Sequence, residues 1–362
     1  MEQNKTTQNI NFNFCSTFLK SGFFKSVYIY IMTVIKGIEL DDFKYKKNEL
    51  KLVIQNNDPI EDKLHVIAVI SNPCLYVTRY ILFKEFIQRL ENEEQNIILY
   101  IVELTYGDQK FIMTDSKNPR HLQINIKIPL WHKENMINLG VKKLLPYNWK
   151  AFAWIDADLE FESSTWALDT LKILNGHKDI VQIWSHCVDM DKQGCTMKIF
   201  NSGGYQYYKG HKHCGTGINY WHPGYAWAMT RKAYEKIGGL YDNAILGSGD
   251  NIMMLALLGN AIKAITSEST EGYKQSIIKY EKKISTLRFG YVPGMIYHYF
   301  HGSKKNRQYT ERWKILSENN FDPFTFIDYD KNGILIPTVN CPETLVSGIM
   351  AYFEKRNEDE FL

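Results

Sequence analysis

The sequence predicts an α/β protein with a mostly parallel sheet flanked by helices in a single main domain. Leu64–Ile70 is an apolar run typical of a buried strand, Tyr76–Leu90 has apolar residues at helical spacing, and Asn96–Leu104 is a second apolar run. A strand, a helix and a strand in succession favour parallel pairing, since a parallel crossover usually contains a helix. A third apolar run, Phe152–Ile155, ends abruptly in two carboxylates. It is expected to be the central, buried strand with its C-terminal end open to a site, since charge inside a buried strand would be desolvated.

Between these strands the chain predicts one further strand and one further helix. His121–Ile128 alternates less clearly and is expected to be an edge strand or a loop that returns to the sheet. Trp131–Leu145 has the spacing of a helix, which Pro146 stops. This helix leads into the central strand.

After the central strand the pattern predicts a helix, a strand and a long loop. Ser163 or Ser164 is expected to cap the helix Thr165–Leu174. Asp179–Trp184 is apolar enough for a further strand. Asn201–Asn219 is rich in Gly, Tyr and His without a sustained period, and is expected to be a long loop over the site.

Two helices are predicted in the following segment. The first is Thr230–Ile237, which ends at Gly238-Gly239. The second is Asn251–Leu258, which the turn Gly247-Ser248-Gly249-Asp250 opens.

Composition is that of a globular protein with a sizeable core. The 362 residues are 44% hydrophobic and 23% charged, and the formal net charge is +3. A balance this even does not favour nucleic acid as a partner, and the basic run from Lys304 to Arg307 is too short to change that. We expect an N-terminal extension at residues 1–60, the main domain at 61–314 and a C-terminal tail at 315–362.

Cysteine usage and hydropathy favour a cytoplasmic protein without a transmembrane span. The six cysteines are scattered and form no C-x-x-C pair, which favours reduced thiols, although their even number leaves a disulfide framework open. The apolar segment Val27–Ile35 is about half the ~20 residues needed to cross a bilayer. Contact of this segment with a membrane surface is the alternative.

The carboxylates at the end of the central strand suggest a metal site. Residues two apart in extended chain point to the same face, so Asp156 and Asp158 present their oxygens side by side. Mg²⁺ and Mn²⁺ bind carboxylate oxygens and usually retain water or substrate phosphate as further ligands. The alternative is an ordinary strand-to-turn transition in which an Asp caps the next helix.

Four features in this order give the chain a family resemblance. They are the Asp156/Asp158 pair, the turn Gly247-Ser248-Gly249-Asp250, the histidines His298 and His301, and the basic run Lys304–Arg307. Over roughly residues 64–314 the chain resembles the nucleotide-sugar-dependent glycosyltransferases of the GT-A fold, a Rossmann-like architecture. It is most similar to the inverting galactosyltransferase-type and family-2-like enzymes.

The resemblance implies a metal centre. Asp156-Ala157-Asp158 matches the D-x-D motif, which holds Mn²⁺ or Mg²⁺ on the donor pyrophosphate. His301 matches the C-terminal metal ligand, and His298, three residues earlier, is also expected to reach the metal. Imidazole ligands favour Mn²⁺ over Mg²⁺.

The resemblance also implies a site for a nucleotide-sugar donor, a UDP- or GDP-sugar. The segment Trp131–Gly140 is similar to a helix whose start lies near the nucleotide, and His222–Arg231 to a segment that runs under the donor sugar. The basic run Lys304–Arg307 is expected to contact phosphate. The donor-binding residues implied are Lys133, Asn138, Asp156, Trp227, Lys304 and Arg307.

By the same resemblance, Asp250 is the catalytic base of a hexosyltransferase that inverts the anomeric carbon. It would accept the proton of the attacking hydroxyl on a glycan or glycoconjugate acceptor. The family usually has an acidic residue directly before this Asp, whereas Gly249 takes that place here. Asp250 is therefore the only carboxylate of the turn.

Other functions fit the sequence less well. A zinc site of His211, His213, Cys214 and His222 would match no closed Cys/His pattern. A phosphatase with an Asp nucleophile usually carries its motif on the first strand. A glycoside hydrolase and a non-catalytic carbohydrate- or nucleotide-binding module remain as alternatives, and both differ from a transferase in their need for metal and donor.

Overall fold

The computed structural model describes residues 34–36, 38–39, 43–93, 95–217 and 220–360. The apolar segment Val27–Ile35 and most of the predicted N-terminal extension therefore lie largely outside the described residues. None of the helices in the described ranges is long and apolar enough to cross a membrane.

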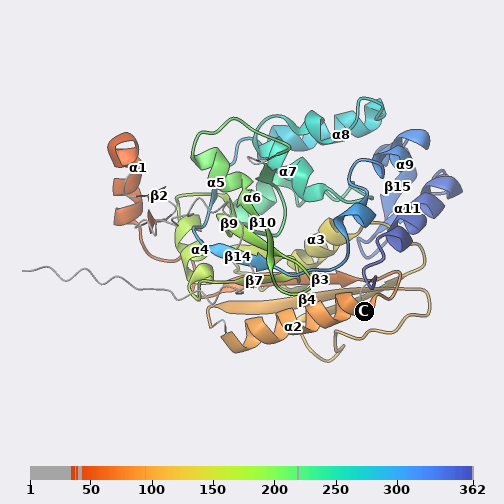
Figure 1. Cartoon of the computed structure of the whole chain (residues 1–362), viewed down its shortest axis with the longest axis horizontal. Coiled ribbons are helices and arrows are strands. Elements are labelled where there is room, and N and C mark those ends of the chain that lie inside the picture. The colour runs from red at the N-terminus through yellow and green to blue at the C-terminus, as the bar shows by residue number, and fades with distance from the viewer. Residues whose placement is uncertain (1–33, 37, 40–42, 94, 218–219, 361–362) are drawn as a thin grey trace, which may run out of the picture.

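A seven-stranded sheet forms the centre of the molecule, and its strands run mostly parallel (Figure 1). Four of its neighbouring pairs are parallel, and only β12 runs antiparallel to its two neighbours. The α/β fold class with a mostly parallel sheet is confirmed. In spatial order the strands are β13 (Phe289–Tyr291), β8 (Ile180–Gln182), β12 (Ala226–Thr230), β6 (Ala151–Ile155), β3 (Leu64–Ser71), β4 (Ile97–Tyr106) and β5 (His121–Ile126).

The predicted strand-helix-strand unit is present. β3 and β4 pair in parallel over the whole length of β3, from Leu64 opposite Ile97 to Ser71 opposite Leu104. β6 lies between β3 and β12, and all five of its residues are buried. Its continuous apolar sequence is explained by this central place, since a strand covered on both faces has no solvent side. The predicted edge strand, β5, does lie at the edge of the sheet.

Helices cover both faces of this sheet. α2 (Val77–Glu93) and α4 (Trp166–Leu174) pack on one face, where Phe83, Phe86 and Leu171 join a hydrophobic cluster with strand residues. On the other face lie α3 (Lys133–Leu144), α6 (Arg231–Ile237), α7 (Gly249–Leu257), η3 (Ala261–Ala264) and α8 (Glu271–Ile284). Figure 1 shows α2 below the sheet and α3, α7 and α8 above it.

A second, five-stranded sheet carries the chain from the end of β6 into the site. Its strand β14 pairs antiparallel with β7 and parallel with β9, so that His298 lies opposite both Leu159 and Asp189. β7 begins directly after Asp158. In spatial order the strands are β11 (Trp221–His222), β10 (Thr196–Ser202), β9 (His186–Met190), β14 (Met295–His298) and β7 (Leu159–Phe161).

Two local predictions are wrong. The segment 201–219 is not a loop throughout, because α5 (Gly203–Tyr208) begins in it, with the Ser202 hydroxyl accepting a hydrogen bond from the backbone N–H of Tyr205. Neither Ser163 nor Ser164 is the N-cap of α4. That position belongs to Thr165, whose hydroxyl donates to the Asp169 carboxylate at 2.8 Å instead of capping the backbone.

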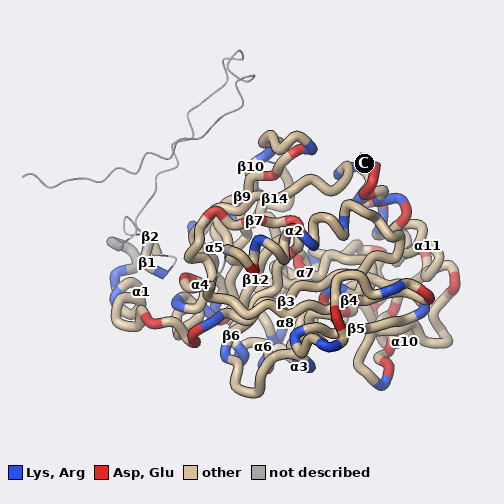
Figure 2. Tube along the Cα trace, turned by 90° about the horizontal axis from the view of Figure 1, so that it is seen from below, with Lys and Arg blue, Asp and Glu red and all other residues tan. Residues whose placement is uncertain are grey.

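The segments before and after the main domain lie at opposite ends of the molecule (Figures 1 and 2). Leu345, Ile349 and Tyr352 of the C-terminal segment belong to the main hydrophobic cluster. Along the trace, Lys and Arg are interspersed with Asp and Glu (Figure 2). The elements are β1 (Val34–Ile35), β2 (Ile38–Glu39) and α1 (Phe43–Gln55) at one end, and α9 (Trp313–Glu318), α10 (Pro323–Phe326), β15 (Ile327–Tyr329), β16 (Leu335–Pro337) and α11 (Glu343–Lys355) toward the other. The short helix η4 (Lys304–Arg307) lies between β14 and α9 in the chain.

Candidate metal and catalytic site

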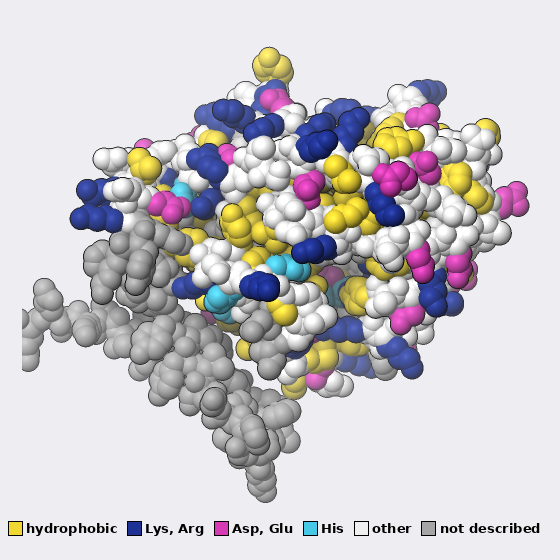
Figure 3. Space-filling model, turned by 90° about the horizontal axis from the view of Figure 1, so that it is seen from above, with side chains coloured by type: hydrophobic (Ala, Val, Ile, Leu, Met, Phe, Trp, Pro, Cys, Tyr) yellow, Lys and Arg dark blue, Asp and Glu magenta, His cyan; other side chains and the backbone are white. Residues whose placement is uncertain are grey.

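A cavity of about 810 Å³ opens at the C-terminal ends of β3 and β6, and we call it the central cavity. Ligands of open α/β sheets bind outside the carboxyl ends of parallel strands, where loops diverge. Both strands supply lining residues, and α3, α7 and the segment after β14 supply others. Figure 3, which looks at the molecule from above, shows His side chains beside Lys and Arg side chains near the middle of this face.

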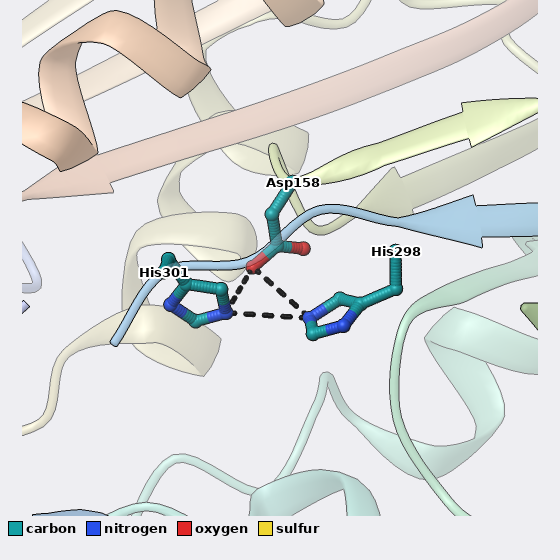
Figure 4. A group of neighbouring side chains, drawn as sticks. All are labelled: Asp158, His298 and His301. Carbon is teal, nitrogen blue, oxygen red and sulfur yellow. Dashed lines mark hydrogen bonds and ion pairs between the residues drawn. The ribbon is translucent and has the colours of Figure 1, made fainter. Parts of the chain in front are cut away.

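Three side chains in the central cavity form a candidate metal centre, which we call the metal cluster: Asp158, His298 and His301 (Figure 4). The Nε2 atom of His301 lies 2.7 Å from Oδ2 of Asp158, and Nε2 of His298 lies 3.7 Å from the same oxygen. The two Nε2 atoms are 3.3 Å apart. One possible ligand atom from each residue therefore lies close enough to the others to share a single ion.

The second sheet explains why these residues meet. Asp158 directly precedes β7, and β7 pairs with β14, which ends at His298. β14 also pairs with β9, which brings the buried carboxylate of Asp189 to within 2.7 Å of Nδ1 of His298. Asp189 also accepts a hydrogen bond from Lys304. A hydrogen bond to Nδ1 fixes the orientation of a histidine ring and directs its Nε2 atom toward a ligand.

Burial and neighbouring charges shift the pKa values of the two histidines in opposite directions. Burial and the nearby Arg307 guanidinium lower the pKa of His301 to about 4, so this ring is neutral at pH 7. Burial also acts to lower the pKa of His298, but the carboxylates of Asp158 and Asp189 outweigh it and raise the pKa. Burial alone would raise the pKa of Asp158, and the two histidines hold it well below its usual value. Asp158 is therefore ionised at neutral pH.

The metal cluster fits a divalent cation. The Oδ1 atom of Asp158 is buried and has no hydrogen-bond partner among the described residues, and a bound cation would satisfy it. A carboxylate with two imidazoles is a donor set that suits transition metals such as Mn²⁺. Across the part of the chain that the structure describes, these are the only three His, Cys, Asp or Glu residues grouped closely enough to hold an ion.

The first Asp of the D-x-D motif takes a different position. Asp156 pairs with the ammonium of Lys133, the first residue of α3, and both line the central cavity. Burial acts to lower the pKa of Lys133, but the surrounding carboxylates of Asp156 and Asp250 raise it overall. The structure thus brings three of the four predicted metal ligands together and places Asp156 beside them, on a lysine.

Asp250 lies in the first turn of α7 and lines the central cavity. The helix begins at Gly249, two residues before the predicted start at Asn251. The Asp250 carboxylate accepts a hydrogen bond from the backbone N–H of Asn251 at 2.8 Å. A Cβ atom on Gly224 would lie only 2.7 Å from Oδ2 of Asp250, so the glycine makes room for this carboxylate.

The predicted donor-binding residues divide into two groups. Lys133, Asp156, Lys304 and Arg307 line the central cavity. Asn138 lies away from it, where its amide accepts from the backbone N–H of Leu240 and donates to the carbonyl of the same residue. The Trp227 ring is buried in the core, and its indole N–H donates to the carbonyl of Pro223 at 2.8 Å.

Several residues of the cavity escaped sequence reasoning. Glu134 lines it next to Lys133, and Asp189 supports His298. A third group, which we call the C-terminal ion cluster, consists of Arg79, Arg356 and Glu358. Only Asp189 could have been found from the sequence, because the alternation in Cys187-Val188-Asp189-Met190 places it at a buried strand position. Glu358 had no such signal, because its partner Arg79 lies 279 residues away in the chain.

Comparison with known proteins gives only distant similarity. No family model matches the chain, and no curated protein sequence matches it. A Drosophila β-1,4-galactosyltransferase 7 mutant, solved with manganese, UDP-Gal and xylobiose, matches 55% of this chain and 62% of its own length, with 11% identity and a TM-score of 0.32. This chain thus spans less than two thirds of that structure.

Two bacterial structures cover more of the chain. A nucleotide-diphospho-sugar transferase, described as putative, from Desulfovibrio desulfuricans matches over 72% of this chain and 96% of its own length, with 10% identity and a TM-score of 0.32. A 4-diphosphocytidyl-2C-methyl-D-erythritol synthase from Anaerococcus prevotii matches over 65% and 88%, with 12% identity and a TM-score of 0.34. Their similarity to this chain concerns the fold and assigns no activity.

Proposed function

We propose that this protein is a metal-dependent glycosyltransferase that moves a sugar from a nucleotide-sugar donor to a hydroxyl of a carbohydrate or glycoconjugate acceptor, with inversion. The observation that supports this most is that the metal cluster and the Asp250 carboxylate line one cavity. A single displacement needs a charge-stabilised leaving group at one end and a proton acceptor at the other.

The leaving diphosphate is assigned to the side of the cavity that holds the metal cluster. Mn²⁺ or Mg²⁺ held there by Asp158, His298 and His301 would act as a Lewis acid on the diphosphate. Lys304 and Arg307 line the same side and would bind phosphate oxygens by charge-assisted hydrogen bonds.

Asp250 is assigned the proton transfer. Its carboxylate accepts the proton of the acceptor hydroxyl. At the same time the hydroxyl oxygen bonds to the anomeric carbon, and the bond from that carbon to the diphosphate breaks. The Asn251 N–H orients one carboxylate oxygen, and Gly224 leaves space beside the other. General-base assistance of this kind contributes about 10²–10⁴-fold in rate.

The test measures nucleoside diphosphate release from a panel of UDP-, GDP- and dTDP-sugars with sugar acceptors. Each donor is assayed with Mn²⁺, with Mg²⁺ and with chelator, and its binding is measured in parallel by calorimetry. We expect one donor to turn over only with metal. Asp250→Asn should still bind this donor but transfer sugar about 10²–10⁴-fold more slowly. Asp62→Asn, an exposed Asp before β3, is the matched control.

Two results would overturn the proposal. If the protein bound no nucleotide-sugar with either metal, a non-catalytic binding module for another ligand would be favoured. Hydrolysis of glycosides in the presence of chelator would favour a glycoside hydrolase, for which Asp250 and Glu134 of the same cavity offer two carboxyl groups.

A further inference from the structure

Glu134 is a buried carboxyl in the central cavity to which the proposed reaction gives no role. It is the second residue of α3, only 7% of its surface is exposed, and it lines the cavity. The described residues form no ion pair with it within 4 Å. Its carboxyl accepts a hydrogen bond from its own backbone N–H, but a buried carboxyl without an ion-pair partner is costly to maintain, so its position needs an explanation.

The chain makes room for Glu134 at Gly249. A Cβ atom at position 249 would lie 2.4 Å from Oε1 and 2.5 Å from Cδ of Glu134, which is closer than real atoms approach. Any other residue there would displace the carboxyl. Asp250 rests against Gly224 in the same manner, with 2.7 Å between Oδ2 and the corresponding Cβ position. Both carboxyls thus reach the cavity over a glycine, and Gly249, which lies against Glu134, is adjacent to Asp250 in the chain.

Glu134 has charged neighbours from both ends of the proposed reaction. It follows Lys133, which pairs with Asp156 beside the metal cluster. It also lies against Gly249, the residue before Asp250, the proposed base. Lys133, Asp250 and Asp156 are the charged groups that act on the Glu134 carboxyl. Tyr273 and Tyr280 of α8 are buried nearby, and a charged Glu134 would act to raise the pKa of each of their hydroxyls.

The electrostatic environment keeps this carboxyl neutral. Burial raises the pKa of Glu134 to about 8, an increase that Lys133 opposes and that Asp250 and Asp156 reinforce. A protonated carboxyl has one O–H donor and free acceptor lone pairs. It can therefore both give and take a hydrogen bond with a sugar hydroxyl without placing a further negative charge near the diphosphate.

We propose that Glu134 binds a hydroxyl of the transferred sugar and so selects the sugar of the donor. The inference rests on the proposed function. In a single displacement the transferred group must lie between the leaving diphosphate and the base, and Glu134 lines the same cavity as the groups assigned to those ends. The ligand class is a nucleotide-linked pyranose with a free hydroxyl directed at α3.

The test compares binding of a donor with binding of the same molecule without its sugar. Calorimetry with Mn²⁺ gives the affinities of the nucleotide-sugar that the wild type turns over and of its nucleoside diphosphate, and their ratio measures the contribution of the sugar. We expect Glu134→Ala to reduce this ratio about tenfold, as for a lost buried hydrogen bond, and to leave the nucleoside diphosphate affinity unchanged. Glu134→Gln should restore most of the ratio, because an amide also donates and accepts.

A second variant tests the same idea without altering Glu134. Gly249→Ala should displace the carboxyl and reduce the ratio as Glu134→Ala does. Unchanged nucleoside diphosphate affinity in each variant shows that the protein is folded.

The outcomes separate this inference from the proposed function. If Glu134→Ala retains the wild-type ratio, or weakens nucleotide-sugar and nucleoside diphosphate equally, Glu134 does not bind the sugar, whereas the transferase proposal stands. If the wild type binds no nucleotide-sugar at all, the transferase proposal fails, and this inference fails with it.

Discussion

The metal cluster and the C-terminal ion cluster both line the central cavity, but they differ in how their charges are satisfied. In the C-terminal ion cluster both oxygens of Glu358 accept hydrogen bonds, at 2.9 Å from Arg79 and 2.8 Å from Arg356. In the metal cluster Oδ1 of Asp158 is buried without a hydrogen-bond partner among the described residues.

The difference lies in which carboxylate has an oxygen without a hydrogen-bond partner in the described part of the chain. A buried ion pair with all its hydrogen bonds made holds segments of the chain together, here α2 and the residues after α11. A buried carboxylate with one oxygen unmet beside two histidines has capacity left for a cation. Both groups look alike in the sequence, where each is a few scattered charged residues.

We expect the two clusters to respond differently when one carboxylate is replaced. We expect Asp158→Asn to lose metal-dependent turnover by about 10³-fold or more, since a metal Lewis acid contributes several kcal/mol. Its stability should fall less than that of Glu358→Gln. Titration with Mn²⁺ and urea denaturation measure the two effects. Full metal affinity in Asp158→Asn would contradict the assignment.

For the C-terminal ion cluster the largest effect should be on stability. Glu358→Gln leaves the buried guanidinium of Arg356 without its carboxylate and should lower the free energy of unfolding by about 3–5 kcal/mol. The midpoint of urea denaturation at constant slope measures it. Glu235→Gln removes an exposed ion pair with Arg231 and is the control, with an expected change below about 1 kcal/mol. Equal midpoints for both variants would show that the cluster is not structural.

Acid should erase the stability difference between the wild type and Glu358→Gln. Burial acts to raise the pKa of Glu358, but Arg79 and Arg356 lower it far below its usual 4.5. A lowered pKa stabilises the folded state above about pH 4.5, and this stabilisation is lost as the pH falls below that value. The two midpoints should therefore stay apart from pH 5 to 7 and draw closer as the pH falls from about 4.5 to 3. A constant difference across this range would contradict the pairing.

The smallest expected effect concerns the support of the metal cluster. Asp189→Asn keeps a hydrogen-bond acceptor for Nδ1 of His298 but removes the charge, and should weaken Mn²⁺ binding about 10–100-fold. Calorimetric titration with Mn²⁺ measures the change. If Asp189→Asn bound Mn²⁺ as the wild type does, His298 would be oriented by other contacts.

Much of the main sheet could be predicted because its signals are local. The apolar runs of β3, β4 and β6 and the spacing in α2 record burial along a few consecutive residues. The end of β6 at the two carboxylates and the start of α7 near Asp250 are equally local. The confirmed fold class follows from such signals, whereas the role expected for Asp250 in the site came from the family resemblance.

What the sequence did not reveal depends on contacts between distant segments. Asp189 becomes a partner of His298 only because β9 and β14 pair in one register of the second sheet, and Glu134 is accommodated only because Gly249 passes it. The sequence by itself determined which apolar segments are buried and where strands end in carboxylates, since periodicity and side-chain chemistry encode both. Only the tertiary structure decided which carboxylates meet histidines, which meet arginines and which remain unpaired, because those pairings depend on how strands and helices far apart in the chain pack together.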